Sequence, residues 1–121
     1  MKKYYFLFSF VIITLFLAAS PEKIVVIDPS AQHDHGEYYD PADKPEVYYD
    51  DDNQEIILVG DGFASYYDVS IISVPTMSLV HYEQVSGYGG SIDISSLPND
   101  NYKIVIITSY NNMYEGYFTN Y

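Results

Sequence analysis

The segment from Ser91 to Thr108 reads Ser-Ile-Asp-Ile-Ser-Ser-Leu-Pro-Asn-Asp-Asn-Tyr-Lys-Ile-Val-Ile-Ile-Thr, and it decides the fold class of this chain. Every second residue at 92 and 94, and again at 104 and 106, is isoleucine, which is typical of strands with one buried face. Between these two runs, proline, asparagine and aspartate favour a tight turn. We therefore predict strands over residues 91–94 and 102–108, joined by a short loop.

Two residues of this segment have predicted structural roles. Leu97 precedes the turn, and we expect its side chain to close one end of the core. Tyr102 opens the second strand directly after the loop, where the hydroxyl of a tyrosine corner bonds to backbone a few residues upstream. The sequence therefore predicts that Leu97 and Tyr102 stabilise the fold and do not bind a ligand.

The same pattern recurs outward from this segment, over most of the chain. Short β-type runs alternate with turn residues from position 46 to the end, and no run has an apolar stripe at helical spacing. The predicted strands are residues 46–49, 55–59, 67–73, 78–84, 91–94, 102–108 and 114–119. Strands spaced by about ten residues are typical of two-sheet sandwiches. The fold class is therefore all-β, a seven-stranded immunoglobulin-like antiparallel sandwich.

Alternation within these strands also predicts which side chains form the core. The expected inward-facing residues are Val69, Ile71, Val80, Tyr82, Ile92, Ile94, Ile104, Ile106, Tyr114 and Phe118.

The N-terminal part has the three regions of a secretory signal. Lys2 and Lys3 precede an apolar run over residues 4–17, and small residues follow at 18–20. We assign residues 1–20 to a signal peptide, 21–45 to a polar acidic leader, and 46–121 to the sandwich domain. The protein is expected to be exported, and so periplasmic, cell-surface or secreted. Because Pro21 follows the cleavage position, an uncleaved signal stays as an alternative, and it would be the chain's one membrane contact.

Charge and cysteine content exclude several functions. Seventeen acidic residues stand against five lysines, giving a formal net charge of −12, and the chain has no cysteine. Such a chain repels phosphate backbones and anionic membrane surfaces, so we expect no nucleic-acid partner. The absence of cysteine excludes disulfides, thiolate metal sites and cysteine nucleophiles.

No motif predicts catalysis or a cofactor. His33 and His35 are weak candidate metal ligands, because they lie in the polar leader without a surrounding scaffold. The acidic run at 50–53 lacks the glycine and the terminal glutamate of a calcium-binding EF-hand loop. Neither a nucleophile elbow nor a glycine-rich phosphate loop is present. We therefore expect a protein that is not an enzyme and binds no cofactor.

A candidate binding surface follows from strand alternation. If Ile104 and Ile106 face the core, Val105 and Ile107 face outward, and Ile72 and Tyr117 share that parity. An exposed apolar patch of this kind usually marks an interface. Alternatively, the leader residues 24–27, which could form a strand along a sheet edge or be mobile, would cover it.

We therefore predict a non-catalytic extracytoplasmic interaction module that binds an unknown protein partner, or a second copy of itself, through this patch. A first alternative is a small glycan-binding module. It would use tyrosines near loops, at positions 66, 88, 110 and 121.

Two resemblances bear on these hypotheses. Residues 91–106, followed by Asn-Met-Tyr-Glu-Gly-Tyr-Phe at 112–118, resemble an uncharacterised family of short secreted proteins with one immunoglobulin-like domain from Bacteroides-type gut bacteria. This resemblance implies the fold and export, but no activity. A weaker likeness, to C-terminal sorting domains of the type nine secretion system, rests on Leu97-Pro98 and Tyr102 and implies a sorting role. Those domains usually end in basic residues, whereas this chain ends Tyr-Phe-Thr-Asn-Tyr.

Overall fold

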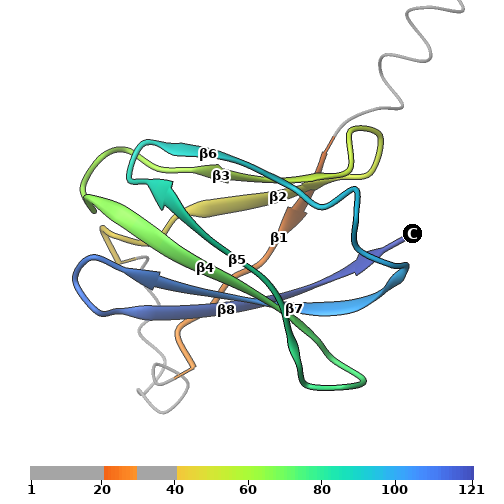
Figure 1. Ribbon diagram of the computed structural model, residues 1–121. Coiled ribbons are helices and arrows are strands. Elements are labelled where there is room, and N and C mark those ends of the chain that lie inside the picture. Colours follow the sequence, from red (N-terminus) through yellow and green to blue (C-terminus); the bar gives the residue numbers. More distant parts are fainter. Residues whose placement is uncertain (1–20, 30–40) are drawn as a thin grey trace, which may run out of the picture.

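The computed structural model describes residues 21–29 and 41–121, and in them the chain forms an antiparallel β-sandwich (Figure 1). The strands are β1 Glu22–Ile24, β2 Glu46–Asp50, β3 Glu55–Val59, β4 Tyr66–Ser73, β5 Leu79–Ser86, β6 Gly89–Asp93, β7 Asp100–Thr108 and β8 Met113–Asn120. The first sheet has the order β1-β2-β3-β6, and the second sheet has the order β5-β4-β7-β8. No helix in the described part of the chain is long and apolar enough to cross a membrane.

All seven predicted strands are present as β2 to β8, with ends that differ by a few residues. The predicted count of seven is nevertheless too low, because β1 precedes them and pairs antiparallel with β2. Its three residues lie in the polar leader and overlap at Ile24 the segment 24–27, for which a strand along a sheet edge is one of the two expectations. The folded unit therefore includes residues of the leader as well as residues 46–121.

The core lies between the two sheets and consists mainly of branched aliphatic and tyrosine side chains. Its largest fully buried members are Tyr67, Tyr102, Tyr114, Ile56, Leu58, Ile71, Ile92, Ile94, Ile104 and Ile106. This set contains most of the predicted inward residues. Alternation on β4, β6, β7 and β8 therefore identified the buried face of each strand correctly.

The inward prediction is wrong for β5. Val80 and Tyr82 are 38% and 55% exposed, whereas Val85 is buried. The register between β4 and β5 shifts between Ile71 and Ile72, and β5 is an edge strand of its sheet. Residues 81–86 pair with β4 in one unbroken register, and this places His81, Glu83 and Val85 on the inward side and Tyr82 on the outward side. An edge strand can carry polar residues on its inward side, so the apolar residues of β5 do not mark its buried face.

Tyr102 and Leu97 lie where the sequence places them, around the turn between β6 and β7. The Tyr102 hydroxyl donates to the Pro98 carbonyl oxygen at 2.5 Å, which is the geometry of a tyrosine corner. The Tyr102 ring stacks on Phe118 with ring centroids 5.4 Å apart. Leu97 is partly buried and packs against the core.

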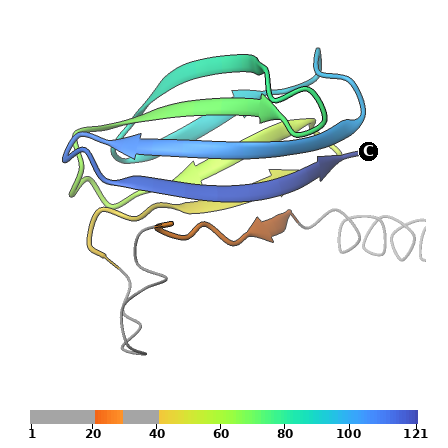
Figure 2. The ribbon, with the colours of Figure 1, turned by 90° about the horizontal axis from the view of Figure 1, so that it is seen from below.

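The leader joins the two sheets along one side of the sandwich. After β1 pairs with β2, Ile27 exchanges two backbone hydrogen bonds with Glu115 of β8, at 2.9 and 2.8 Å. Figure 2 shows this segment running alongside β8. Val26 packs directly against Gly116 of β8. A residue with a side chain at position 116 would place its Cβ 2.8 Å from Val26 Cγ1, which is too close. The lack of a side chain at Gly116 thus lets the leader approach β8.

Candidate interaction surfaces

The four residues of the predicted patch lie on the outward side of the second sheet. Ile72 is on β4, Val105 and Ile107 are on β7, and Tyr117 is on β8. Ile72 and Tyr117 both pair with Lys103, so they lie on either side of it in one row across the sheet. Tyr117 is 62% exposed and Ile107 is 36% exposed, while Ile72 and Val105 are half-buried. The structure therefore brings all four together on one face.

Further apolar side chains extend this face beyond the predicted residues. Met113 pairs with Ile107, and Leu79 pairs with Ile72. Tyr82 of β5 is exposed as well and lies opposite Ser70 on the same side. We call these seven residues the second-sheet face: Ile72, Leu79, Tyr82, Val105, Ile107, Met113 and Tyr117.

The charged groups on the second-sheet face have partners within it. Lys103 Nζ lies 3.2 Å from Glu115 Oε1, in an ion pair that is mostly shielded from solvent. The Asp68 carboxylate accepts hydrogen bonds from the Tyr82 hydroxyl at 2.7 Å and from Gln84 at 3.2 Å. On this face Lys103 and Glu115 therefore neutralise each other, whereas Asp68 is hydrogen-bonded by neutral groups and keeps its negative charge.

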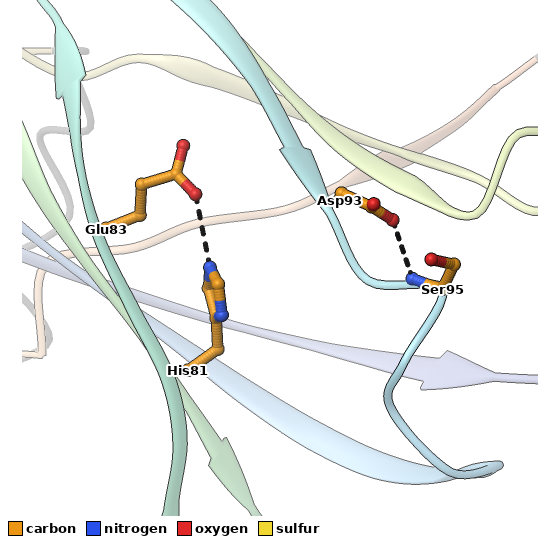
Figure 3. Close-up of polar contacts among 4 residues, drawn as sticks. All are labelled: His81, Glu83, Asp93 and Ser95. Atoms are coloured by element: carbon orange, nitrogen blue, oxygen red, sulfur yellow. Dashed lines mark hydrogen bonds and ion pairs between the residues drawn. The ribbon is translucent and has the colours of Figure 1, made fainter.

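The outer side of the first sheet has a different character. Glu55 and Asp93 lie directly opposite each other on β3 and β6, and Glu46 is exposed on β2. The backbone N–H of Ser95, with a smaller contribution from nearby His81, holds the pKa of Asp93 below its ordinary value (Figure 3). Asp93 is thus ionised at neutral pH, and this side of the sandwich is acidic.

Residues 24–27 do not cover the second-sheet face. Ile24 and Val26 point into the core, and Val25 is 71% exposed. The leader contacts β8 at its outer edge, through the backbone of Glu115. Of the two readings of the patch, coverage by residues 24–27 is therefore wrong, because these residues close the side of the sandwich and not a sheet face.

A groove of about 590 Å³ lies where the leader diverges from β8. Glu22, Lys23 and Val25 line one side of it, and Tyr117, Thr119 and Tyr121 line the other. The backbone N–H of Tyr121 donates to the Tyr49 hydroxyl at 3.3 Å, which fixes the end of β8 against β2. Pockets that hold small ligands have volumes of about 300–1,000 Å³, and this groove falls in that range.

Exposed aromatic side chains also gather at the end of the sandwich formed by three turns. Phe63 and Tyr110 have ring centroids 5.2 Å apart, and Tyr88 lies against Gly62. Tyr66 is close by, because its carbonyl oxygen accepts from the backbone of Ser109. Three of the four predicted tyrosines therefore share one end, whereas Tyr121 lies with the groove at the end of β8.

Asp43 forms a buried hydrogen-bond network that the sequence did not indicate. Its carboxylate accepts from Tyr114 at 2.6 Å, from Thr108 at 2.7 Å and from Asn112 at 2.8 Å. Burial alone would raise the pKa of Asp43, but these hydrogen bonds outweigh it and hold the pKa below its ordinary value. Burial, together with the Asp43 carboxylate, raises the pKa of Tyr114. The hydroxyl groups of Tyr114 and Thr108 reach Asp43 from across the sandwich, and no sequence pattern shows that.

The candidate metal ligands gain no support from the structure. His33 and His35 lie outside the described residues. In the acidic run at 50–53, Asp50 accepts from the backbone N–H groups of Asp52 and Asn53, which is ordinary turn stabilisation. Within residues 21–29 and 41–121, no three histidine, aspartate or glutamate side chains converge on a possible metal position.

Comparison with known proteins shows the fold. The chain is similar to the crystal structure of a DUF3244 family protein with an immunoglobulin-like β-sandwich fold from Bacteroides vulgatus, with a TM-score of 0.63 and 16% sequence identity. The match covers 84% of this chain and 100% of that protein. No family model and no curated protein matches the sequence. The fold is thus an immunoglobulin-like sandwich, as predicted.

Proposed function

We propose that this protein is an exported, non-catalytic interaction module that binds a protein partner through the second-sheet face. The observation that carries the proposal is the gathering of exposed apolar side chains on one sheet, where Lys103 and Glu115 form an ion pair with each other. Such patches on soluble proteins usually mark interfaces. The acidic outer side of the first sheet supports the choice of face, because charged residues are depleted from interface centres.

The wider assignment has separate support. The likeness to the Bacteroides vulgatus protein supports placing the chain among uncharacterised secreted immunoglobulin-like proteins of Bacteroides-type bacteria. The charged, apolar and small-residue regions of positions 1–20 support export. Export would place the second-sheet face in the periplasm, at the cell surface or in the medium.

Two matched variants test the proposal. Ile107→Asp places a charge on the second-sheet face, beside Met113, and Val59→Asp places one on the exposed outer side of the first sheet. We expect immobilised wild-type protein and Val59→Asp to capture the same partner from an envelope extract, and Ile107→Asp to lose it. Equal capture by both variants would reject the second-sheet face as the site. Light scattering on the purified protein identifies the case in which the partner is a second copy.

Glycan binding is a second candidate, and the aromatic end of the sandwich supports it. Phe63, Tyr66, Tyr88 and Tyr110 supply exposed rings from neighbouring turns, and such rings can stack on sugar faces. The wild-type protein should then give signals on a glycan array. Tyr88→Ala and Tyr110→Ala should remove these signals, and Ile107→Asp should leave them unchanged. An array without signals removes this candidate.

A further inference from the structure

The four sheet edges of this sandwich differ in how they are protected against pairing with another chain. Open edges present unpaired N–H and C=O groups, and native proteins protect them with short strands, bulges, charged residues or inward-pointing charges. The edge strands are β1 and β6 in the first sheet, and β5 and β8 in the second sheet.

Three of the edges carry them. β5 has the register shift at Ile71/Ile72 and, on its inward side, the charged residue Glu83, whose carboxylate lies 3.2 Å from His81 Nε2 (Figure 3). β1 has three residues, of which Glu22 and Lys23 are charged. β6 is short and begins with two glycines. These features make each of the three edges a poor template for another strand.

The end of β8 lacks such devices. β8 has eight residues and runs without a register shift against β7. The leader forms backbone hydrogen bonds with it only at Glu115 and packs against Gly116, and from position 117 onward the strand contains no lysine, proline or acidic residue. This part of the second sheet is thus the one edge in the described chain without protection.

The backbone groups at this edge can be assigned from the pairing pattern. Glu115 directs both its N–H and its C=O away from β7, because both bond to Ile27. In an antiparallel strand the direction alternates, so the N–H and C=O groups of Tyr117 and Thr119 also point away from β7. The N–H of Tyr121 follows the same rule and reaches Tyr49. Tyr117 and Thr119 therefore direct four backbone groups into the groove beside the leader.

We propose that an extended, lysine- or arginine-containing segment of another protein adds to β8 at Tyr117 and Thr119, and extends the second sheet. The alternating donors and acceptors of this edge match a polypeptide backbone, as in other cases of strand addition. Charge selects the occupant: the chain carries a formal net charge of −12, so a cationic segment is attracted and a second copy is repelled. This inference uses the β8 edge, and it is independent of the proposed docking on the second-sheet face.

A peptide titration tests the inference. The probe is a short fluorescent peptide that alternates lysine and valine, compared with one in which glutamate replaces every lysine. We expect the lysine peptide to bind and to shift the backbone amide resonances of Tyr117 and Thr119, and the glutamate peptide to bind at least about tenfold more weakly. The absence of binding by the lysine peptide, or equal binding of both peptides, overturns the proposal.

Variants of Thr119 separate edge pairing from other modes of binding. Thr119→Pro removes an N–H that points away from β7, so the ladder to β7 stays complete, and edge strands tolerate proline at such positions. We expect this variant to weaken binding of the lysine peptide about tenfold, because backbone hydrogen bonds to the peptide are lost. Thr119→Lys keeps every backbone N–H group and should also weaken binding of the lysine peptide. This variant supplies the test if Thr119→Pro fails to fold.

Ile107→Asp is the matched control, because it changes the second-sheet face and leaves the β8 edge unchanged. It should bind the lysine peptide like the wild type, even though it fails in partner capture. Wild-type binding by both Thr119 variants would overturn the inference. A dimer that Thr119→Pro dissociates, seen by light scattering, would also overturn it by making a second copy the occupant.

Discussion

Asp43 connects the leader to the far end of the second sheet through hydrogen bonds from Tyr114, Thr108 and Asn112. Hydrogen bonds to a charged acceptor stabilise a fold by about 1.5–3 kcal/mol, and a buried donor left without an acceptor costs about 1–3 kcal/mol. We therefore interpret Asp43 as a structural anchor, whose charge is stabilised by donors on every side.

The substitution Asp43→Asn should lower the free energy of unfolding by about 2 kcal/mol at pH 7, because the amide cannot accept the same charge-assisted hydrogen bonds. The loss depends on pH with a defined sign. The pKa of Asp43 is lower in the folded protein than its ordinary value of 3.8, so the wild-type advantage is present above pH 3.8 and disappears as the pH falls through the folded pKa. Urea unfolding from pH 7 down to pH 3 measures the difference.

The exposed acid Asp52 supplies the control, since Asp52→Asn should change stability little at any pH. A constant difference between wild type and Asp43→Asn over the whole pH range would contradict the role given to the carboxylate. Comparison with a variant is needed because protonation of the other acids also relieves the repulsion within this highly charged chain.

At the scale of single elements, β5 shows how polar residues on an edge strand limit association. His81 and Glu83 lie opposite the buried residues Ile71 and Val69, and so face the interior at the open side of the sandwich. Charges in this position would be buried without adequate solvation if another strand paired with β5. The polar side chains of His81 and Glu83 therefore disfavour pairing at this edge while they stay accessible to water.

Replacing both residues, His81→Val together with Glu83→Val, should make β5 an apolar edge and cause concentration-dependent oligomers. Light scattering and size-exclusion chromatography over a range of protein concentrations measure this change. Gln84→Val, on the outward side of the same strand, should have the same oligomeric state as the wild type at every concentration. If the double variant has the same mass as the wild type at every concentration, the protective role of the pair is wrong.

The whole molecule depends on the leader, since residues 22–27 join the edges of both sheets. Ile24 and Val26 are buried, and full burial of such side chains stabilises by about 1.5–3 kcal/mol each, partly offset by the entropy of ordering the segment. The leader therefore contributes to the fold although its composition is polar.

A chain that begins at residue 28 should be less stable than one that begins at residue 21, by about 2–3 kcal/mol, because it lacks these two buried side chains. It should still fold, since β2 to β8 contain both sheets. Urea unfolding compares the two chains, and Val25→Ser controls for changes at an exposed leader position. Equal stability of both chains would show that the leader contacts contribute nothing.

The sequence determined most of the fold because strand alternation is a local property. Ile92, Ile94, Ile104 and Ile106 each show their buried side by spacing alone, and turn residues set the ends of the strands. The parity that assigned Ile72, Val105, Ile107 and Tyr117 to one outward side has the same local origin. Alternation cannot, however, show which side of an edge strand faces the core when that side carries polar residues such as His81 and Glu83, and for that reason Val80 and Tyr82 were assigned to the wrong side.

Only the tertiary structure decided which segments meet across the sandwich. Nothing near Asp43 in sequence indicates that Tyr114 and Thr108 surround it. Likewise, nothing near Gly116 indicates that Val26 occupies the space in which a larger residue would place its side chain. The unprotected edge at Thr119 also exists only because residues 22–24 pair with β2, so that the leader meets β8 only near Ile27. Contacts between distant segments depend on the packing of the whole chain, and local residue patterns do not encode them.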